Sequence, residues 1–215
     1  MKKFIFEVLS IATLSSVQGV NLNVLPKPYC DAKLMPYNNH STENWYQNAE
    51  QLAWLIKSCQ IKSIIEIGSW MGNSTCHMAS LLPYDGKVYA VDTWQGSPNE
   101  HHDPMILSIL YDQFLSNVIH SNQTHKIIPY KLDSLEAAKT LNIQADLIYL
   151  DATHEYESAL KDINAWYPHL KQGGIFSGDD WGWGDRGIEK AVVEFTKANN
   201  ITYHTNGWFW YFEKK

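Results

Sequence analysis

Short apolar runs alternate with amphipathic stretches along most of the chain. The apolar runs predict strands at residues 63–67, 87–91, 126–130, 145–150 and 175–177. Apolar residues at a helical period predict helices at residues 41–58, 74–82, 104–120, 134–140, 156–170 and 187–199. Gly173 and Gly174 predict a turn before the fifth strand, and residues 201–204 and 208–212 predict a closing hairpin about Asn206–Gly207.

This alternation predicts an α/β fold, in which a mostly parallel sheet is covered by helices on both faces. The closing hairpin is expected to add an antiparallel strand at one edge of the sheet. Ligands of such sheets bind at the carboxyl ends of the strands, near the point where the strand order reverses. The residues that directly follow each strand are therefore the first place to look for function.

The N-terminal region has a different pattern from the rest of the chain. Residues 1–19 hold Lys2 and Lys3, an apolar stretch and then small or polar residues, as in a secretory signal peptide cleaved after Gly19. Glu7 inside the apolar stretch favours the alternative, an amphipathic N-terminal helix. Residues 20–43 are a proline- and asparagine-containing, loop-rich lead-in, and residues 44–215 are expected to form one domain.

Composition narrows the classes of partner. The chain of 215 residues is 45% apolar and 19% charged, which is typical of a globular domain and not of a disordered one. With 17 Lys and Arg against 23 Asp and Glu, it has no basic face for nucleic acid, and a small-molecule partner is expected. No stretch is long and apolar enough to predict an integral membrane segment, and a homo-oligomer is compatible with the sequence.

The loop after the first predicted strand has the residues of a ligand-binding turn. Gly68 and Gly72 allow a tight backbone turn and close approach of a ligand, and Ser74 begins a helix whose free N–H groups point back toward the loop. The G-x-x-x-G spacing differs from the dinucleotide motif, and a plain strand-to-helix turn is the alternative. Asp92 ends the second strand, where a carboxylate can accept hydrogen bonds from ribose hydroxyls, so the unit predicts a nucleoside site.

Three carboxylates follow the fourth and fifth strands. Asp151 ends the fourth strand, and Asp179 and Asp180 end the fifth. If these strands are neighbours, the like charges meet, and a divalent cation would relieve their repulsion; oxygen ligands of this kind favour Mg²⁺ or Ca²⁺ over zinc. The alternative is that one Asp caps a helix while another faces solvent. His154, three residues after Asp151, is a candidate base for a substrate hydroxyl or else a surface histidine.

On these residues the chain resembles class I S-adenosylmethionine-dependent methyltransferases. The most similar group is the one that contains the cephalosporin-biosynthesis methyltransferase and the metal-dependent sugar O-methyltransferases of macrolide and aminocoumarin pathways. The resemblance runs from about Gln51 to Glu213. Its markers are Glu66-Ile67-Gly68, Tyr89-Ala90-Val91-Asp92, Asp151 with His154 and Tyr156, Gly178-Asp179-Asp180 and the helix that begins at Gly187.

The resemblance implies a Rossmann-like sheet of seven strands and a role for each candidate residue. The cofactor S-adenosylmethionine would lie on the loop of Glu66, Gly68, Ser69, Gly72 and Ser74, with its ribose at Asp92 and its adenine near Asp133 and Ser134. Asp151, Asp179 and Asp180 would hold Mg²⁺, and His154 would act with Asp151 in catalysis. The implied reaction is Mg-assisted O-methylation of a small hydroxylated molecule.

Two other functions compete with this one. A nicotinamide-dependent oxidoreductase would share the sheet but needs a G-x-G-x-x-G motif, which the loop lacks, and has no use for the acidic cluster. A non-catalytic nucleoside- or metal-binding protein of the same fold would retain the loop without turnover. Location is open as well, because cytosolic supply of the cofactor favours the cytoplasm while residues 1–19 resemble an export signal.

Overall fold

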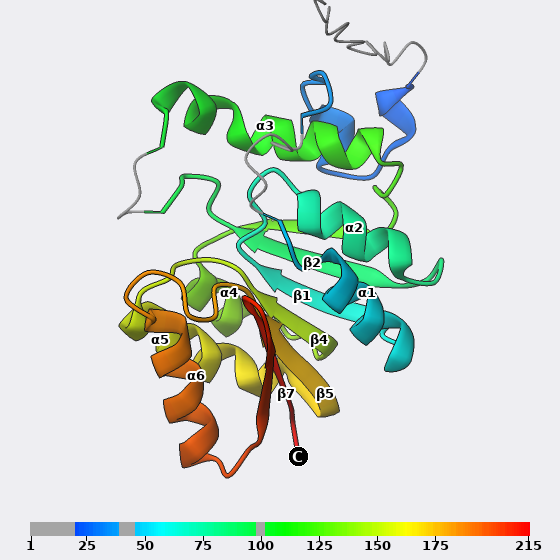
Figure 1. Cartoon of the computed structure of the whole chain (residues 1–215). Coiled ribbons are helices and arrows are strands. Elements are labelled where there is room, and N and C mark those ends of the chain that lie inside the picture. Colours follow the sequence, from blue (N-terminus) through cyan, green and yellow to red (C-terminus); the bar gives the residue numbers. More distant parts are fainter. Residues whose placement is uncertain (1–19, 39–45, 98–101) are drawn as a thin grey trace, which may run out of the picture.

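The computed structural model describes residues 20–38, 46–97 and 102–215 (Figure 1). Its strands are β1 (Ser63–Ile67), β2 (Lys87–Asp92), β3 (Ile127–Lys131), β4 (Ala145–Leu150), β5 (Leu170–Gly178), β6 (Tyr203–Asn206) and β7 (Phe209–Glu213). They form one sheet of seven strands in the order β3-β2-β1-β4-β5-β7-β6. The first five strands in this order are parallel to one another, and β7 is antiparallel to both β5 and β6.

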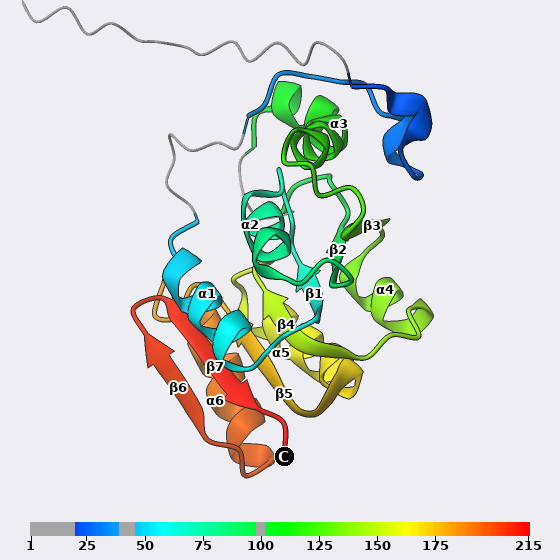
Figure 2. The same cartoon turned by 90° about the vertical axis from the view of Figure 1, so that its right-hand side faces the viewer.

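Six α-helices accompany the sheet. They are α1 (Ala49–Ser58), α2 (Asn73–Leu81), α3 (Pro104–His120), α4 (Ser134–Thr140), α5 (Tyr156–Trp166) and α6 (Gly187–Ala198) in the described part of the chain. Helices α1, α2 and α3 lie on one side of the sheet, and α4, α5 and α6 lie on the other (Figures 1 and 2). The α/β, Rossmann-like fold with helices on both faces is confirmed.

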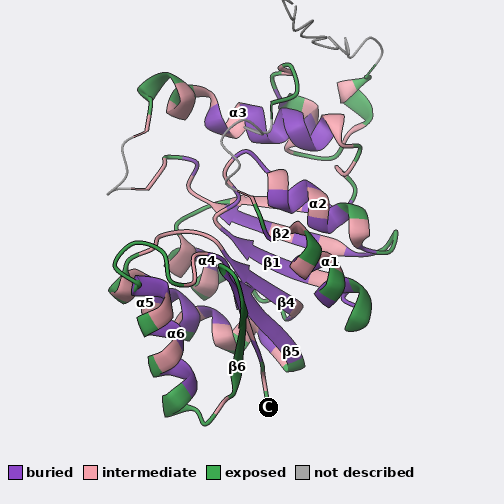
Figure 3. Ribbon diagram, in the orientation of Figure 1, coloured by how far each residue is buried: buried purple, intermediate pink, exposed green. Residues whose placement is uncertain are grey.

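The sheet is buried on both faces because each central strand sends alternate side chains into two cores. On β4, Leu147 and Tyr149 pack with the helices of one layer, while Ile148 and Leu150 pack with those of the other. The strands at the centre of the molecule are accordingly buried, whereas the edge strand β6 is exposed (Figure 3). A parallel sheet buried on both faces explains the nearly continuous apolar runs that predicted these strands.

The predicted helix over residues 41–58 is shorter in the structure. Residues 41–45 lie outside the described residues, residues 46–48 are not helical, and α1 begins at Ala49. Asn48 precedes the helix with its side chain buried, and its amide donates to the Tyr149 hydroxyl at 3.5 Å. This contact with β4 uses a polar side chain that the helical pattern did not account for.

The prediction for the segment between α5 and β5 was wrong in two respects. The α-helix ends at Trp166, and Pro168 lies in a short 3-10 turn, because a proline cannot donate the hydrogen bond that would continue the helix. Gly173 and Gly174 lie inside β5 rather than in a turn before it. The pairing of β4 with β5 shifts its register here, and Gly173 has a positive φ of 72°, so the two glycines form an irregularity within the strand.

The closing hairpin is confirmed with its turn one residue later than predicted. Asn206 pairs with Phe209, so the two-residue loop is Gly207–Trp208, and Gly207 supplies the positive φ of 63°. The strand next to β5 is β7, and β6 forms the edge. The predicted signal peptide or N-terminal helix at residues 1–19 lies outside the described residues, as does the end of the lead-in at 39–43. None of the helices in the described ranges has the length and apolar character that crossing a membrane requires.

Candidate active site

The loop between β1 and α2 is shaped by two glycines. Gly68 has a φ of 88°, and a Cβ added to it would lie 1.9 Å from the carbonyl oxygen of Asp151. Gly72 has a φ of 85°, and its Cβ would lie 3.0 Å from the Phe114 ring. The loop backbone therefore packs directly against the end of β4, which a side chain at Gly68 would prevent.

The buried Glu66 on β1 anchors this loop and the start of α2 through hydrogen bonds. Its carboxylate accepts hydrogen bonds from Ser69 Oγ at 2.7 Å, from Ser74 Oγ at 2.5 Å and from Thr75 Oγ1. Burial raises the pKa of Glu66 to about 7 even though these three hydroxyls lower it, and Asp92 raises it further. The structure thus brings Glu66, Ser69 and Ser74 together, but it directs the two serine hydroxyls to the glutamate.

Asp92 fastens the same loop from the end of β2. One carboxylate oxygen accepts from the backbone N–H groups of Ser69 at 2.9 Å and Trp70 at 2.8 Å, and the other accepts from Trp94 N–H at 2.6 Å. Burial raises the pKa of Asp92, and these backbone hydrogen bonds oppose the rise. Asp92 therefore determines the loop conformation, and its contact with a ribose stays a prediction.

Asp151, Asp179 and Asp180 gather where β4 and β5 end side by side, as the sequence predicted on the condition that these strands pair. Burial, and then the charges of Asp179 and Asp180, raise the pKa of Asp151 well above its ordinary value. Burial, followed by Asp180, raises the pKa of Asp179 to about 6. Asp180 has a φ of 63°, and its N–H donates to Asp179 Oδ1 at 2.7 Å. The carboxylates are close enough to oppose one another's ionisation.

These carboxylates lie near one another but are not arranged as a metal-binding group in the described part of the chain. Within the described ranges, no three His, Cys, Asp or Glu side chains come together as a metal-binding group, so coordination of a metal stays a prediction. The donor set nevertheless fits Mg²⁺, because it consists of carboxylate oxygens whose mutual repulsion a cation would relieve. Thr153, two residues after Asp151, has a buried Oγ1 without a hydrogen-bond partner in the described part of the chain.

His154 lies next to the acidic groups. Its Nε2 is 2.9 Å from Asp180 Oδ2, and its ring contacts Trp183 with centroids 4.7 Å apart. The start of α6 supports this loop, because a Cβ on Gly187 would lie 2.2 Å from the His154 carbonyl oxygen. The predicted base and the predicted metal ligands therefore share one region. The catalytic role of His154 stays a prediction.

Asp133 and Ser134 have structural contacts of their own. Asp133 caps α4 by accepting from the N–H groups of Leu135 and Glu136. Ser134 Oγ donates to Asp162 Oδ1 at 2.5 Å and accepts from Trp166 Nε1 at 2.8 Å. Their predicted place near an adenine remains an expectation.

Sequence reasoning missed a group of polar side chains on the α1 and α2 side of the site. The Tyr149 hydroxyl bridges Asn48 Nδ2 and Asp151 Oδ2, each at 3.5 Å. Tyr46 and His77 form a second pair, at 2.5 Å between the hydroxyl and Nδ1. The two-residue period of a strand places Tyr149 and Asp151 on the same side, which is a signal that the sequence offered. Tyr46, Asn48 and His77 carried no such signal, because their meeting depends on how α1 packs.

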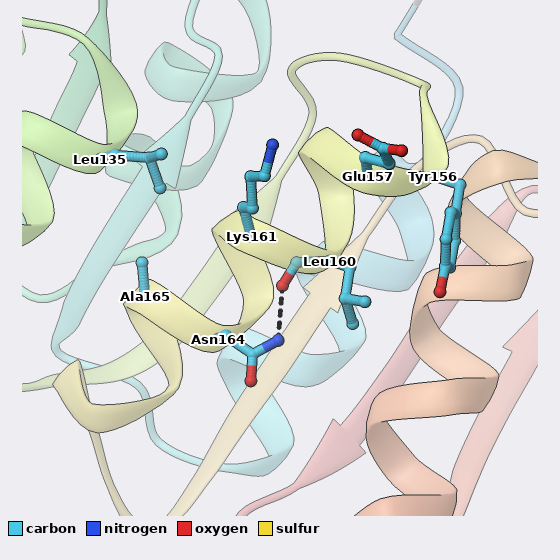
Figure 4. Close-up of a pocket in the computed structure, with 7 residues that line it drawn as sticks. All are labelled: Leu135, Tyr156, Glu157, Leu160, Lys161, Asn164 and Ala165. Carbon is cyan, nitrogen blue, oxygen red and sulfur yellow. Dashed lines mark hydrogen bonds between the residues drawn. The ribbon is translucent and has the colours of Figure 1, made fainter.

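A hollow elsewhere on the surface contains none of the candidate residues. It lies along α5 and the start of α4 (Figure 4). Its lining residues are Leu135, Tyr156, Glu157, Leu160, Lys161, Asn164 and Ala165. The strand ends remain the better candidate, because the perturbed carboxylates are there.

Comparison with known proteins identifies the family. A family described as "Methyltransferase domain" matches residues 65–181, which is more than half of the chain and spans the site from β1 to Trp181. The chain belongs to this methyltransferase family. Its architecture is that of class I S-adenosylmethionine-dependent methyltransferases, as expected. No curated protein matches the chain.

Solved structures share the methyltransferase fold at low sequence identity. The O-methyltransferase TomG from Streptomyces achromogenes, in complex with SAM, is 14% identical with a TM-score of 0.61 over 78% of this chain and 80% of that one. An O-methyltransferase from Bacillus cereus, in complex with SAH, is 17% identical with a TM-score of 0.57 over 84% of both chains. A methyltransferase from Geobacter sulfurreducens is 10% identical with a TM-score of 0.60 over 79% and 78%. At these identities the likeness concerns the fold.

Proposed function

We propose that this methyltransferase uses S-adenosylmethionine to methylate a hydroxyl oxygen of a small molecule, with Mg²⁺ at the acidic cluster. The observation that carries the proposal is the placement of Asp151. Its carbonyl packs against Gly68 of the glycine loop, while burial, and then the charges of Asp179 and Asp180, raise the pKa of its carboxyl group. A cofactor loop and a cation site would thus meet at one strand end, between β1 and β4, where the strand order reverses.

The chain's own residues would divide the work as follows. The backbone of Gly68 and Gly72 would allow the cofactor to approach the start of α2, and Asp92, which holds the loop in place, would also accept hydrogen bonds from the ribose. Asp151, Asp179 and Asp180 would hold the cation. When bound, S-adenosylmethionine supplies an activated methyl group, and Mg²⁺ orients the acceptor and lowers the pKa of its hydroxyl.

His154 would receive the acceptor's proton. Asp180 Oδ2 lies 2.9 Å from its Nε2 and so stabilises the imidazolium that forms. The second oxygen of Asp180 remains for a cation, since a carboxylate has two. Trp181 and Trp183 lie with Asp180 on the loop between β5 and α6, and they would form a wall that excludes water.

The experiment has two parts. Calorimetry of the purified protein with S-adenosylmethionine should show binding, and transfer to catechol-like and sugar diols should require a divalent cation and stop reversibly in EDTA. Asp179→Asn should lose transfer while cofactor binding survives, because the glycine loop and Asp92 are unchanged. Absence of cofactor binding at millimolar ligand would contradict the cofactor assignment, and full transfer in excess EDTA would contradict the metal. Binding with no transfer to any hydroxylated acceptor would favour the non-catalytic alternative.

A further inference from the structure

The sheet ends in a different kind of strand at each side. In the described part of the chain, β3 is the last strand on one side and β6 the last on the other (Figure 2). On β3, Lys126 O accepts from β2 at 3.0 Å, and Leu132 N–H donates to β2 at 3.1 Å. Because the residues that bond a neighbouring strand alternate along the chain, the backbone groups that face away from β2 belong to Ile127, Pro129 and Lys131.

Each of these three residues hinders the addition of a further strand to β3. The carbonyl oxygen of Ile127 already accepts from the Tyr29 hydroxyl at 2.8 Å. Pro129 has no N–H to donate, and Lys131 places an exposed charge beside any added strand. This side of the sheet is therefore protected against pairing with another chain.

The strand β6 lacks such protection in the described ranges. Asn206 pairs with Phe209 across a two-residue loop, so alternation turns the N–H and C=O groups of Tyr203 and Thr205 away from β7. No hydrogen bond reaches these outward groups from elsewhere in the described part of the chain. All four residues of β6 are exposed (Figure 3), and residues 198–212 contain no Asp, Glu, Lys or Arg.

Aromatic side chains continue this exposed strand on both faces of the sheet. On the face of α1, His204 stacks on Tyr211 with ring centroids 4.9 Å apart, and Tyr211 contacts Trp54 at 6.0 Å. Trp54 is 54% exposed. On the face of α6, Tyr203 contacts Trp181 at 5.2 Å. Exposed aromatic groups next to unpaired strand backbone are typical of an association surface.

We propose that β6 pairs antiparallel with β6 of a second copy of this chain, so that the two sheets join across a two-fold axis. A second copy fits because the strand carries no charge, so that no like charges meet in self-pairing. With the axis beside His204, Tyr203 lies opposite Thr205 of the other copy, and the symmetry repeats the same pair. The outward groups of both copies are thereby satisfied at once. This pairing does not depend on the proposed function.

Sedimentation equilibrium of the full chain over about 1–100 μM tests the pairing, and the wild type should reach twice the mass of one chain. Thr205→Pro removes an outward N–H but no hydrogen bond to β7. Because each copy then loses one donor, the dissociation constant of the dimer should rise at least about tenfold. Thr205→Val is the matched control, since it keeps the N–H and a β-branched side chain, and it should leave the dissociation constant unchanged.

A charge variant provides the test if Thr205→Pro does not fold. Tyr203→Lys introduces two like charges near the two-fold axis, so it should also weaken the dimer. Tyr84→Lys is its control, because Tyr84 is 83% exposed and follows α2, outside the sheet. It should sediment like the wild type.

Hydrogen exchange locates the interface. As the wild-type concentration rises, the amides of Tyr203 and Thr205 should become protected, whereas that of Lys131 at the other side of the sheet should not change. A wild type that stays monomeric overturns the proposal and leaves an extended strand of a different protein as the occupant to test. A dimer without protection at Tyr203 and Thr205, or one that Thr205→Pro and Tyr203→Lys both leave intact, overturns it as well.

Discussion

Replacing Gly68 by alanine should destabilise the protein far more than the loss of one glycine normally does. The new Cβ would lie 1.9 Å from the Asp151 carbonyl oxygen, so the loop and the end of β4 must separate by about 1 Å to reach a normal contact. The φ of 88° adds strain of about 1–2 kcal/mol for a residue with a Cβ. Both atoms in the clash belong to backbone segments, which cannot rotate away. We expect a loss of at least about 3 kcal/mol in the free energy of unfolding.

Gly182→Ala is the matched control for this prediction. Gly182 has a φ of 77°, and a Cβ there would meet nothing within 4 Å, so the variant carries the backbone strain without the clash. Urea unfolding of both variants should show the larger loss at Gly68, and calorimetry should show weakened binding of S-adenosylhomocysteine, because Asp151 and the loop shift together. Equal losses in the two variants would refute the reasoning that the loop packs on Asp151.

Three further predictions concern the groups around the loop. Asp92→Ala should weaken binding of S-adenosylmethionine by about 1.5–3 kcal/mol in calorimetry, because three backbone N–H groups lose a charged acceptor; wild-type affinity would contradict its role. Glu66 has a pKa raised from 4.5 to about 7, so its contribution to stability is complete below pH 4.5 and is lost as pH rises through 7. In the wild type, the free energy of unfolding should therefore fall by about 2–3 kcal/mol between about pH 5 and about pH 8, measured with urea in EDTA. Glu66→Gln should lack this fall, because its amide does not ionise. An identical fall in both proteins would show that Glu66 does not titrate in this range. Ser134→Ala should cost about 1–3 kcal/mol in the same unfolding assay at neutral pH, because Asp162 and Trp166 lose a shared partner; a loss near zero would count against that bridge.

The elements of the fold were predictable where one local cause decides them. Helix α3 begins and ends as predicted, and its start has both a capping aspartate, Asp103, and a proline at the first helical position. Strands β1 and β4 also have the predicted bounds, because a strand buried on both faces needs an uninterrupted apolar run. Gly173 and Gly174 were misplaced because a glycine pair fits a turn and a strand irregularity equally well, and only the pairing with β4 distinguishes the two.

The candidate site was predictable as a set of positions and not as a set of contacts. Residues that follow parallel strands must meet at one edge of the sheet, so the sequence predicts that Gly68, Asp92 and Asp151 lie near one another. Which groups their neighbours bond depends on distances of a few ångströms between elements far apart in the chain. Ser69 and Ser74 turn inward to Glu66, which no spacing rule indicates.

The electrostatics of the site follow from this arrangement. Glu66, Asp151 and Asp179 all have raised pKa values, with burial as the largest cause in each case. A carboxyl group of this kind stabilises the fold at low pH and withdraws that contribution as pH rises through its folded-state pKa, which is the reverse of the usual salt-bridged aspartate. Near neutral pH the ligand-free protein therefore carries a cost in stability at the edge of the sheet where we place the cofactor and the cation. Binding of positive charge there would offset this cost, so the buried negative charge that weakens the free fold would favour the sulfonium and the divalent cation that we propose.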